Sequence, residues 1–144
     1  MLIGEYKHSL DDKKRVAIPA RFRKELGKRV VITHGLDQCL WVYTIGEWNK
    51  VAEKLSGLSF GQADTRGFNR FMLSGAIEVE LDSLGRILVP DFLKEYAHLK
   101  ERVVFAGVHS RVEVWDEDRW SVYKKKISLQ ADELAQKLGE IGVI

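Results

Sequence analysis

The pattern of apolar and polar positions occurs twice in this 144-residue chain, at an interval of about 71 residues. Each copy begins with an alternating apolar and polar segment, which predicts a strand with one buried face. A short polar turn and a segment rich in β-branched residues follow, and they predict a tight connection to a second strand. We expect this strand, turn and strand over residues 6–10, 11–14 and 15–18 of the first copy and residues 77–81, 82–85 and 86–89 of the second.

Each copy then continues with a short helix and two further strands. The chain has two prolines, Pro19 and Pro90, at equivalent positions where a helix can start, because the first helical residue needs no amide donor. The expected helices cover residues 20–26 and 91–98, and the expected strands cover residues 30–33, 40–43, 103–106 and 112–115.

Individual residues also match between the copies. Asp11 matches Asp82 and Arg15 matches Arg86 at an offset of 71, and at an offset of 72 Tyr43 matches Trp115 and Trp48 matches Trp120. A unit of about 45 residues is too small to bury a stable core by itself. We therefore expect a β-rich α+β fold in which the two copies pack against each other about a pseudo-twofold axis.

A helical connector is expected between the copies. Thr44 and Glu47 have the spacing of a capping box, and Gly57 marks the expected end of that helix. Its apolar positions recur at helical spacing, namely Trp48, Val51, Leu55 and Leu58. A second helix is expected to open near Asp64 and to bury Phe68, Phe71 and Met72.

A long helix is expected at the C-terminus. Asp116 can cap it, and Glu117 and Asp118 in the first turn suit the positive end of the helix dipole. The apolar stripe of this helix, which we expect to pack on the body or on a neighbouring subunit, comprises Trp120, Tyr123, Ile127, Ala131, Leu134, Leu138 and Ile141. The predicted organisation is one copy over residues 5–47, a connector over 48–75, a second copy over 76–119 and a C-terminal helix over 120–144.

Composition and charge restrict the possible functions. With 45% hydrophobic and 31% charged residues, no apolar run of about 20 residues and a charged N-terminal segment, the chain is expected to be cytoplasmic, without a membrane partner. Residues 1–30 carry nine Lys and Arg against four Asp and Glu, a local charge of +5, whereas residues 76–103 carry four against six, a charge of −2. This distribution favours a surface that faces a polyanion at one end, although a solvated basic face would have the same charge.

Enzymatic and metal chemistry have little support. The four histidines show no metal-ligand spacing, phosphate-binding glycine patterns are missing, and Cys39 is more typical of a core residue than of a nucleophile. The tryptophans could stack on RNA bases, but their matches between the copies favour packing. We expect no cofactor, no metal and no small-molecule substrate.

The two turn segments, Asp-Asp-Lys-Lys-Arg-Val-Ala-Ile-Pro at residues 11–19 and Asp-Ser-Leu-Gly-Arg-Ile-Leu-Val-Pro at residues 82–90, resemble the duplicated Asp-x-x-x-Arg motif of the MraZ family. This family consists of bacterial transcriptional regulators of the division and cell-wall gene cluster. The resemblance implies two tandem AbrB-like swapped-hairpin repeats that form an intramolecular pseudo-dimeric β-barrel with flanking helices. It also implies ring-like homo-oligomers that bind tandem repeats in double-stranded promoter DNA, including that of the protein's own gene, in the nucleoid. Lys14 departs from the second copy, which has glycine there.

The candidate nucleic-acid-binding residues are Arg15 and Arg86. An arginine beside a tight turn can extend its planar guanidinium to guanine or phosphate. In the alternative interpretation, each arginine only braces the hairpin by pairing with Asp11 or Asp82. For these two aspartates we favour the orienting role, since a carboxylate that faced DNA would repel it.

Lys13 and Lys14 are candidate phosphate contacts, because their counterparts in the second copy are uncharged. Solvated turn lysines are the alternative. Three function classes therefore remain: a sequence-specific DNA-binding regulator, an AbrB-like antitoxin or protein-interaction module, and, last, a small enzyme.

Overall fold

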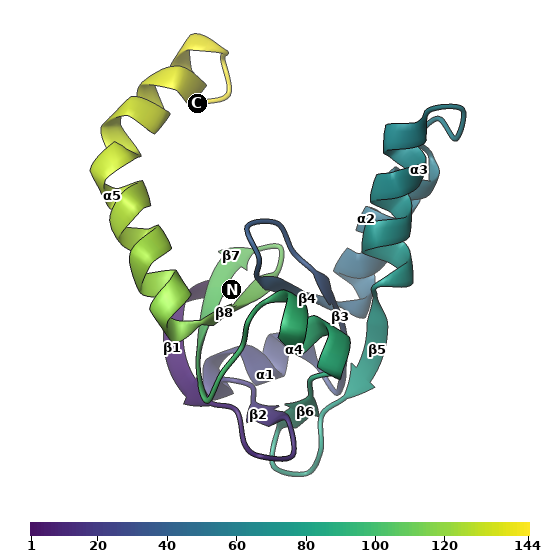
Figure 1. Cartoon of the computed structure of the whole chain (residues 1–144), viewed down its shortest axis with the longest axis vertical. Coiled ribbons are helices and arrows are strands. Elements are labelled where there is room, and N and C mark those ends of the chain that lie inside the picture. Colours follow the sequence, from purple (N-terminus) through teal and green to yellow (C-terminus); the bar gives the residue numbers. More distant parts are fainter.

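The computed structural model describes all 144 residues, and each half of the chain folds into the same series of elements (Figure 1). The first copy contains β1 (Leu2–Ser9), β2 (Arg15–Ala17), α1 (Ala20–Leu26), β3 (Arg29–His34) and β4 (Leu40–Thr44). The second copy contains β5 (Ile77–Glu80), β6 (Arg86–Leu88), α4 (Asp91–Tyr96), β7 (Arg102–His109) and β8 (Val112–Asp116). The predicted duplication is therefore present, and Pro19 and Pro90 occupy the N-cap positions of α1 and α4.

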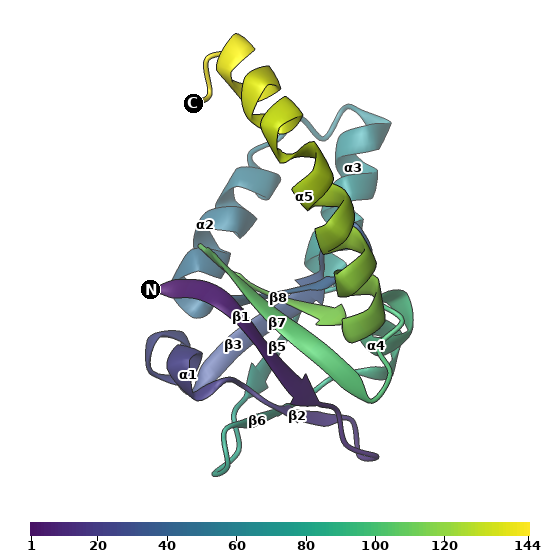
Figure 2. The same ribbon diagram turned by 90° about the vertical axis from the view of Figure 1, so that its left-hand side faces the viewer.

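The two copies exchange strands in one antiparallel sheet of six strands, in the order β1-β7-β8-β4-β3-β5 (Figure 2). β1 of the first copy pairs with β7 of the second, and β5 of the second copy pairs with β3 of the first. In the centre β4 pairs with β8, with Trp41 opposite Glu113. The pattern is symmetric about this pair, as a pseudo-twofold axis requires.

The sheet has two open edges, β1 and β5, so the expected barrel is not closed by hydrogen bonds. Instead, a separate antiparallel ribbon of β2 and β6 lies between the ends of the two edge strands (Figure 1). These two strands have three residues each, and they pair with each other with Val16 opposite Ile87. The amide of Ile18 donates to the carbonyl of Gly85 at 2.9 Å, and the amide of Val89 donates to the backbone carbonyl of Lys14 at 2.8 Å.

One hydrophobic core unites the copies. It contains 19 buried residues drawn from both halves, including Phe22 of α1 and Phe105 of β7. Val16 and Ile87 point from the ribbon into this core and are each 1% exposed. Because neither half has a core of its own, the copies form one cooperative unit.

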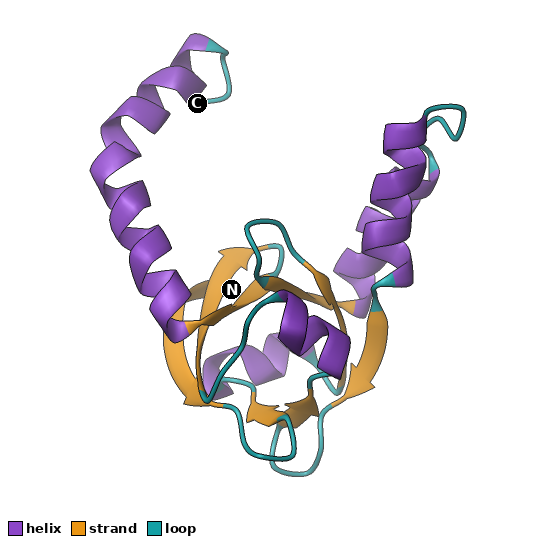
Figure 3. Cartoon of the chain, in the orientation of Figure 1, coloured by secondary structure: helices purple, strands orange, loops and turns teal.

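Two helical arms extend from the sheet on the side opposite to the ribbon (Figures 1 and 3). One consists of α2 (Ile45–Ser56), α3 (Ala63–Asn69) and the π-helical turn η1 (Arg70–Ser74), and the other is α5 (Glu117–Glu140). The hydroxyl of Thr44 accepts from the amide of Glu47 at 3.0 Å, but the Glu47 carboxylate pairs with Lys50, so only half of the expected capping box forms.

The arms bury less than their patterns predict. No residue of α5 is buried: Trp120 and Tyr123 pack around Trp115, and the stripe beyond Ile127 is exposed. In the other arm Met72 is buried, but Leu58 lies beyond the end of α2 and is exposed, as is Phe68. None of the helices combines the length and the hydropathy needed to cross a bilayer.

Candidate nucleic-acid interface

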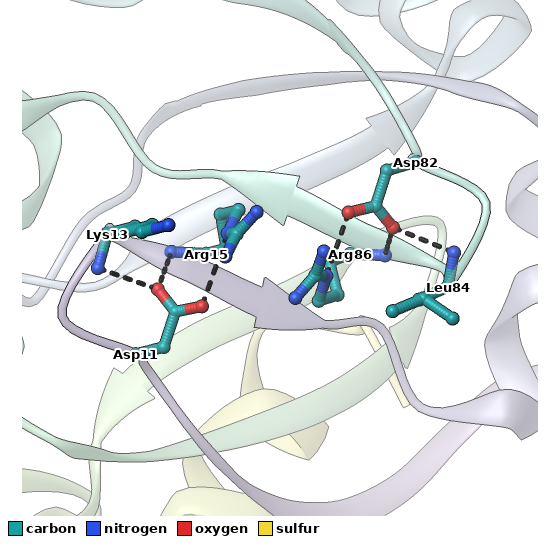
Figure 4. Close-up of polar contacts among 6 residues, drawn as sticks. All are labelled: Asp11, Lys13, Arg15, Asp82, Leu84 and Arg86. Carbon is teal, nitrogen blue, oxygen red and sulfur yellow. Dashed lines mark hydrogen bonds and ion pairs between the residues drawn. The ribbon is translucent and has the colours of Figure 1, made fainter.

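The first turn is organised by Asp11. One carboxylate oxygen, Oδ1, accepts from the backbone amides of Lys13 and Arg15, both at 2.9 Å. The other, Oδ2, accepts from Nε of the Arg15 side chain at 3.2 Å (Figure 4). Lys14 has a φ of 61°, so a lysine occupies a left-handed conformation that glycine adopts more easily.

The second turn repeats this geometry. Oδ1 of Asp82 accepts from the amides of Leu84 and Arg86 at 2.9 Å, and Oδ2 accepts from Nε of Arg86 at 2.8 Å (Figure 4). Gly85 has a φ of 76°. The departure at Lys14 therefore leaves the backbone of the first turn unchanged.

Both aspartates are held in the charged form. The pKa of Asp11 lies below its ordinary value, chiefly because the carboxylate accepts the Arg15 amide, and the pKa of Asp82 is lowered mainly by the Arg86 amide. A carboxylate that is ionised at neutral pH therefore lies inside each turn, where it orders the backbone amides and fixes the first part of each arginine side chain. The geometry thus supports the orienting role for both aspartates.

Arg15 and Arg86 come together on one surface. In the ribbon, Arg15 lies opposite Leu88 and Ala17 lies opposite Arg86, so both arginines are on the outer face while Val16 and Ile87 face the core. Each arginine uses Nε for its aspartate, and no hydrogen bond within the chain uses the terminal Nη nitrogens. Each arginine can therefore brace its hairpin and still contact a ligand. Its Nε is fixed by the aspartate, whereas its Nη nitrogens are free to form other hydrogen bonds.

The two lysines of the first turn differ. The ammonium of Lys14 forms an ion pair with Asp91 of α4, whereas Lys13 is exposed and forms no ion pair within the chain. Of the two predicted phosphate contacts, Lys13 is therefore the one whose charge is not already neutralised.

Two residues near the turns were missing from our sequence-based set. Nε of Arg23 in α1 donates to the carbonyl of Ile18 at 2.8 Å, and its side chain packs over Gly85 so closely that a Cβ there would lie 2.5 Å from Nε. Leu88 is exposed on the outer face of the ribbon. The alternation Arg86-Ile87-Leu88 could have placed Leu88 on the same face as Arg86, but the orientation of Arg23 depends on the packing between the copies.

The remaining candidates for chemistry are structural. Cys39 is buried and donates to the carbonyl of Leu36 at 3.2 Å, and burial raises the pKa of its thiol. Tyr43 packs on Trp48 with ring centroids 5.6 Å apart, and Trp115 packs on Trp120 at 5.3 Å, at equivalent places in the two copies. No three His, Cys, Asp or Glu side chains come together as a metal site would require.

The fold and the site define a duplicated β-rich protein whose two copies jointly present a two-stranded ribbon with Arg15 and Arg86 on its outer face. Residues 1–71 and 72–139 each match the family described as "MraZ protein, putative antitoxin-like". The transcriptional regulator MraZ of Moorella thermoacetica is 50% identical over 143 residues, which cover 99% of this chain and the whole relative. That of Caldanaerobacter subterraneus subsp. tengcongensis is 46% identical with the same coverage. The chain belongs to the MraZ family.

Proposed function

We propose that this chain is a sequence-specific DNA-binding transcriptional regulator and that the β2–β6 ribbon enters the major groove. The observation that carries the proposal is the pair of arginines on one exposed ribbon face, each with Nε fixed and both Nη nitrogens free. A two-stranded ribbon fits the width of the major groove, and the free edge of a guanidinium can bind O6 and N7 of guanine. Lys13 adds a phosphate contact at the margin of the ribbon.

The names of the relatives agree with this role, since they are transcriptional regulators. We extend the proposal to the division and cell-wall gene cluster, including the protein's own promoter, and to a location in the cytoplasm on the nucleoid. The exchange of β1 and β5 between the copies supports the AbrB-like swapped-hairpin description. No catalytic, cofactor or small-molecule role is part of the proposal.

Assembly into a ring is part of the same proposal. Beyond Ile127, the body leaves the apolar stripe of α5 uncovered, which favours burial between subunits. The arms extend away from the ribbon, so contacts between arms leave the ribbon of every subunit free (Figure 2). Several ribbons that bind tandem DNA repeats raise the overall affinity through effective concentration.

The test is a gel shift with the DNA upstream of the protein's own gene, run against unrelated DNA of equal length at matched salt. We expect tighter binding to the upstream DNA, and a much weaker complex when only one repeat is present. Equal affinity for both DNAs would contradict sequence-specific regulation. Light scattering without DNA checks the assembly: a mass of 16.5 kDa at micromolar concentration would contradict the ring.

A second candidate is an antitoxin or protein-interaction module, which the wording "putative antitoxin-like" of the family description favours. In that case the exposed arm of α5 would bind a partner protein. Co-purification of a toxin in stoichiometric amount, together with no preference for the upstream DNA, would favour this candidate over the regulator.

A further inference from the structure

The outer face of the ribbon is not symmetric, although its backbone is. Residues 17 and 88 are equivalent in the repeat, and each lies directly across the ribbon from the arginine of the other copy. The first copy has Ala17 at this position, whereas the second has Leu88. Leu88 is 55% exposed, so an apolar side chain is held next to Arg15 on the ribbon face that carries both arginines.

The neighbouring strand positions show that this exposure does not come from a loosely placed strand. Ile87 is 1% exposed and pairs with Val16, which fixes the rotation of β6 and turns the next side chain outward. Leu88 therefore adds nothing to the core. An exposed leucine costs little by itself, but here it lies directly across the ribbon from Arg15, at a position that a polar residue could also occupy.

The tip of the second turn also exposes an apolar side chain. Leu84 is 63% exposed, and its equivalent in the first turn is Lys13. The second copy thus presents apolar side chains at two positions where the first copy presents a lysine and an alanine. The difference is a property of the surface alone, because the hydrogen bonds of the two turns are the same.

We propose that Leu88 contacts the C5-methyl group of a thymine in the major groove and makes the second half of the ribbon selective for that base. The methyl group of thymine is the apolar feature that the major groove presents, and cytosine lacks it. Ala17 has a much shorter side chain, which extends less far from the strand at the equivalent position. The ribbon consequently distinguishes the two directions of an asymmetric DNA site. This inference rests on the proposed function, because it requires the ribbon to bind DNA.

The experiment replaces single thymines by deoxyuridine, which removes only the methyl group. A binding site is first selected from random double-stranded DNA with the wild-type protein, and the affinity of each deoxyuridine variant is measured by fluorescence anisotropy. We expect at least one thymine whose replacement weakens wild-type binding about fourfold, the effect of burying one methyl-sized group. Leu88→Ala should bind the thymine and deoxyuridine sites equally, and Leu88→Met should restore the difference.

Leu84→Ala is the matched control, since it removes an equally exposed leucine from the same copy and should keep the deoxyuridine effect. Melting temperature and oligomer mass establish that each variant is folded and assembled. If the wild type selects no site, the proposed function itself fails. If it selects one but deoxyuridine has no effect, or the effect survives in Leu88→Ala, or Leu88→Ala changes the oligomer mass, the role of Leu88 is overturned while DNA binding stands.

Discussion

The first and second turns have one backbone design and two different surfaces. In both, an aspartate accepts two backbone amides and one arginine Nε, and the residue before the arginine is left-handed. At the tips, however, Lys13 faces solvent in the first turn and Leu84 in the second. The comparison teaches that the internal hydrogen bonds place the arginines, whereas the tip residues determine whether the exposed surface of each turn is charged or apolar.

The turns also differ in the contact that holds each of them to the body. Lys14 of the first turn pairs with Asp91 of α4, which belongs to the second copy. Gly85 of the second turn lies beneath Arg23 of α1, which belongs to the first copy. Each turn is therefore held by the helix of the other copy, by an exposed ion pair in one case and by close packing in the other.

The largest effect is expected from substitution of the arginine that each turn carries, Arg15 in the first and Arg86 in the second. Arg15→Ala and Arg86→Ala should each weaken binding to the selected DNA by about 1–3 kcal/mol per contact, because each removes a guanidinium that the proposed function assigns to a base contact. Binding to random DNA should fall less. Titration of DNA with each variant at fixed salt measures both affinities.

Arg70→Ala is the matched control, since it removes an exposed arginine from the arm opposite to the ribbon. It should bind DNA like the wild type. An Arg15→Ala protein that is folded and keeps full affinity would show that the first turn does not contact bases, and the two turns would then differ in function as well as in surface.

The next prediction concerns Lys14 and Gly85, the two turn residues in the left-handed conformation. Gly85→Ala should destabilise the protein by about 1–2 kcal/mol, because a Cβ is unfavourable at this φ and would displace the Arg23 side chain. Lys14→Gly should change stability by less than about 1 kcal/mol, since the relief of the left-handed conformation offsets a more flexible unfolded chain. Urea denaturation at one protein concentration compares the variants, and equal losses for both would contradict the difference in packing.

A smaller effect concerns the tips. Lys13→Ala should weaken binding to selected and random DNA alike and lower the slope of log affinity against log salt by about 0.9, the value for one phosphate contact. Lys14→Ala should lower it less, because Asp91 already neutralises that ammonium. Salt titrations of both single variants and of the double variant measure the slopes, with Lys125→Ala on α5 as the control. A salt slope unchanged in Lys13→Ala would identify it as a solvated turn lysine.

The repeat and the local elements could be predicted from the sequence because they depend on short-range patterns. The helix at Ala20–Leu26 and the caps at Thr44 and Asp116 agree with the structure, since apolar spacing and capping chemistry determine them locally. The Asp-x-x-x-Arg spacing likewise places a carboxylate within reach of the arginine four residues later.

Features that depend on contacts between distant segments could not be predicted. The pairing of β1 with β7 and the open edge at β5 follow from how the copies interlock, and the π-helical turn at Arg70–Ser74 lies where His34 stacks on Phe71 with ring centroids 4.5 Å apart. The stripe of α5 indicated an amphipathic helix, but periodicity does not say whether the body or another molecule covers it. At the site, the Lys14–Asp91 pair and the packing of Arg23 were missed for the same reason.

The smallest expected effect tests whether the carboxylates of Asp11 and Asp82 order the backbone of the two turns to the same extent. Because the pKa values of Asp11 and Asp82 in the folded protein lie below the ordinary value of 3.8, each ionised carboxylate stabilises the fold above that pH. This stabilisation is lost as the pH falls below 3.8 and through the lower folded pKa values, where both carboxylates become protonated. Asp11→Asn and Asp82→Asn should therefore lower the melting temperature at pH 7, and the difference from the wild type should shrink as the pH is lowered below 3.8. The two variants should behave alike, since the hydrogen bonds to the two carboxylates are the same. A pH-dependent difference confined to one variant would show that the shared backbone design orders only one of the turns in solution.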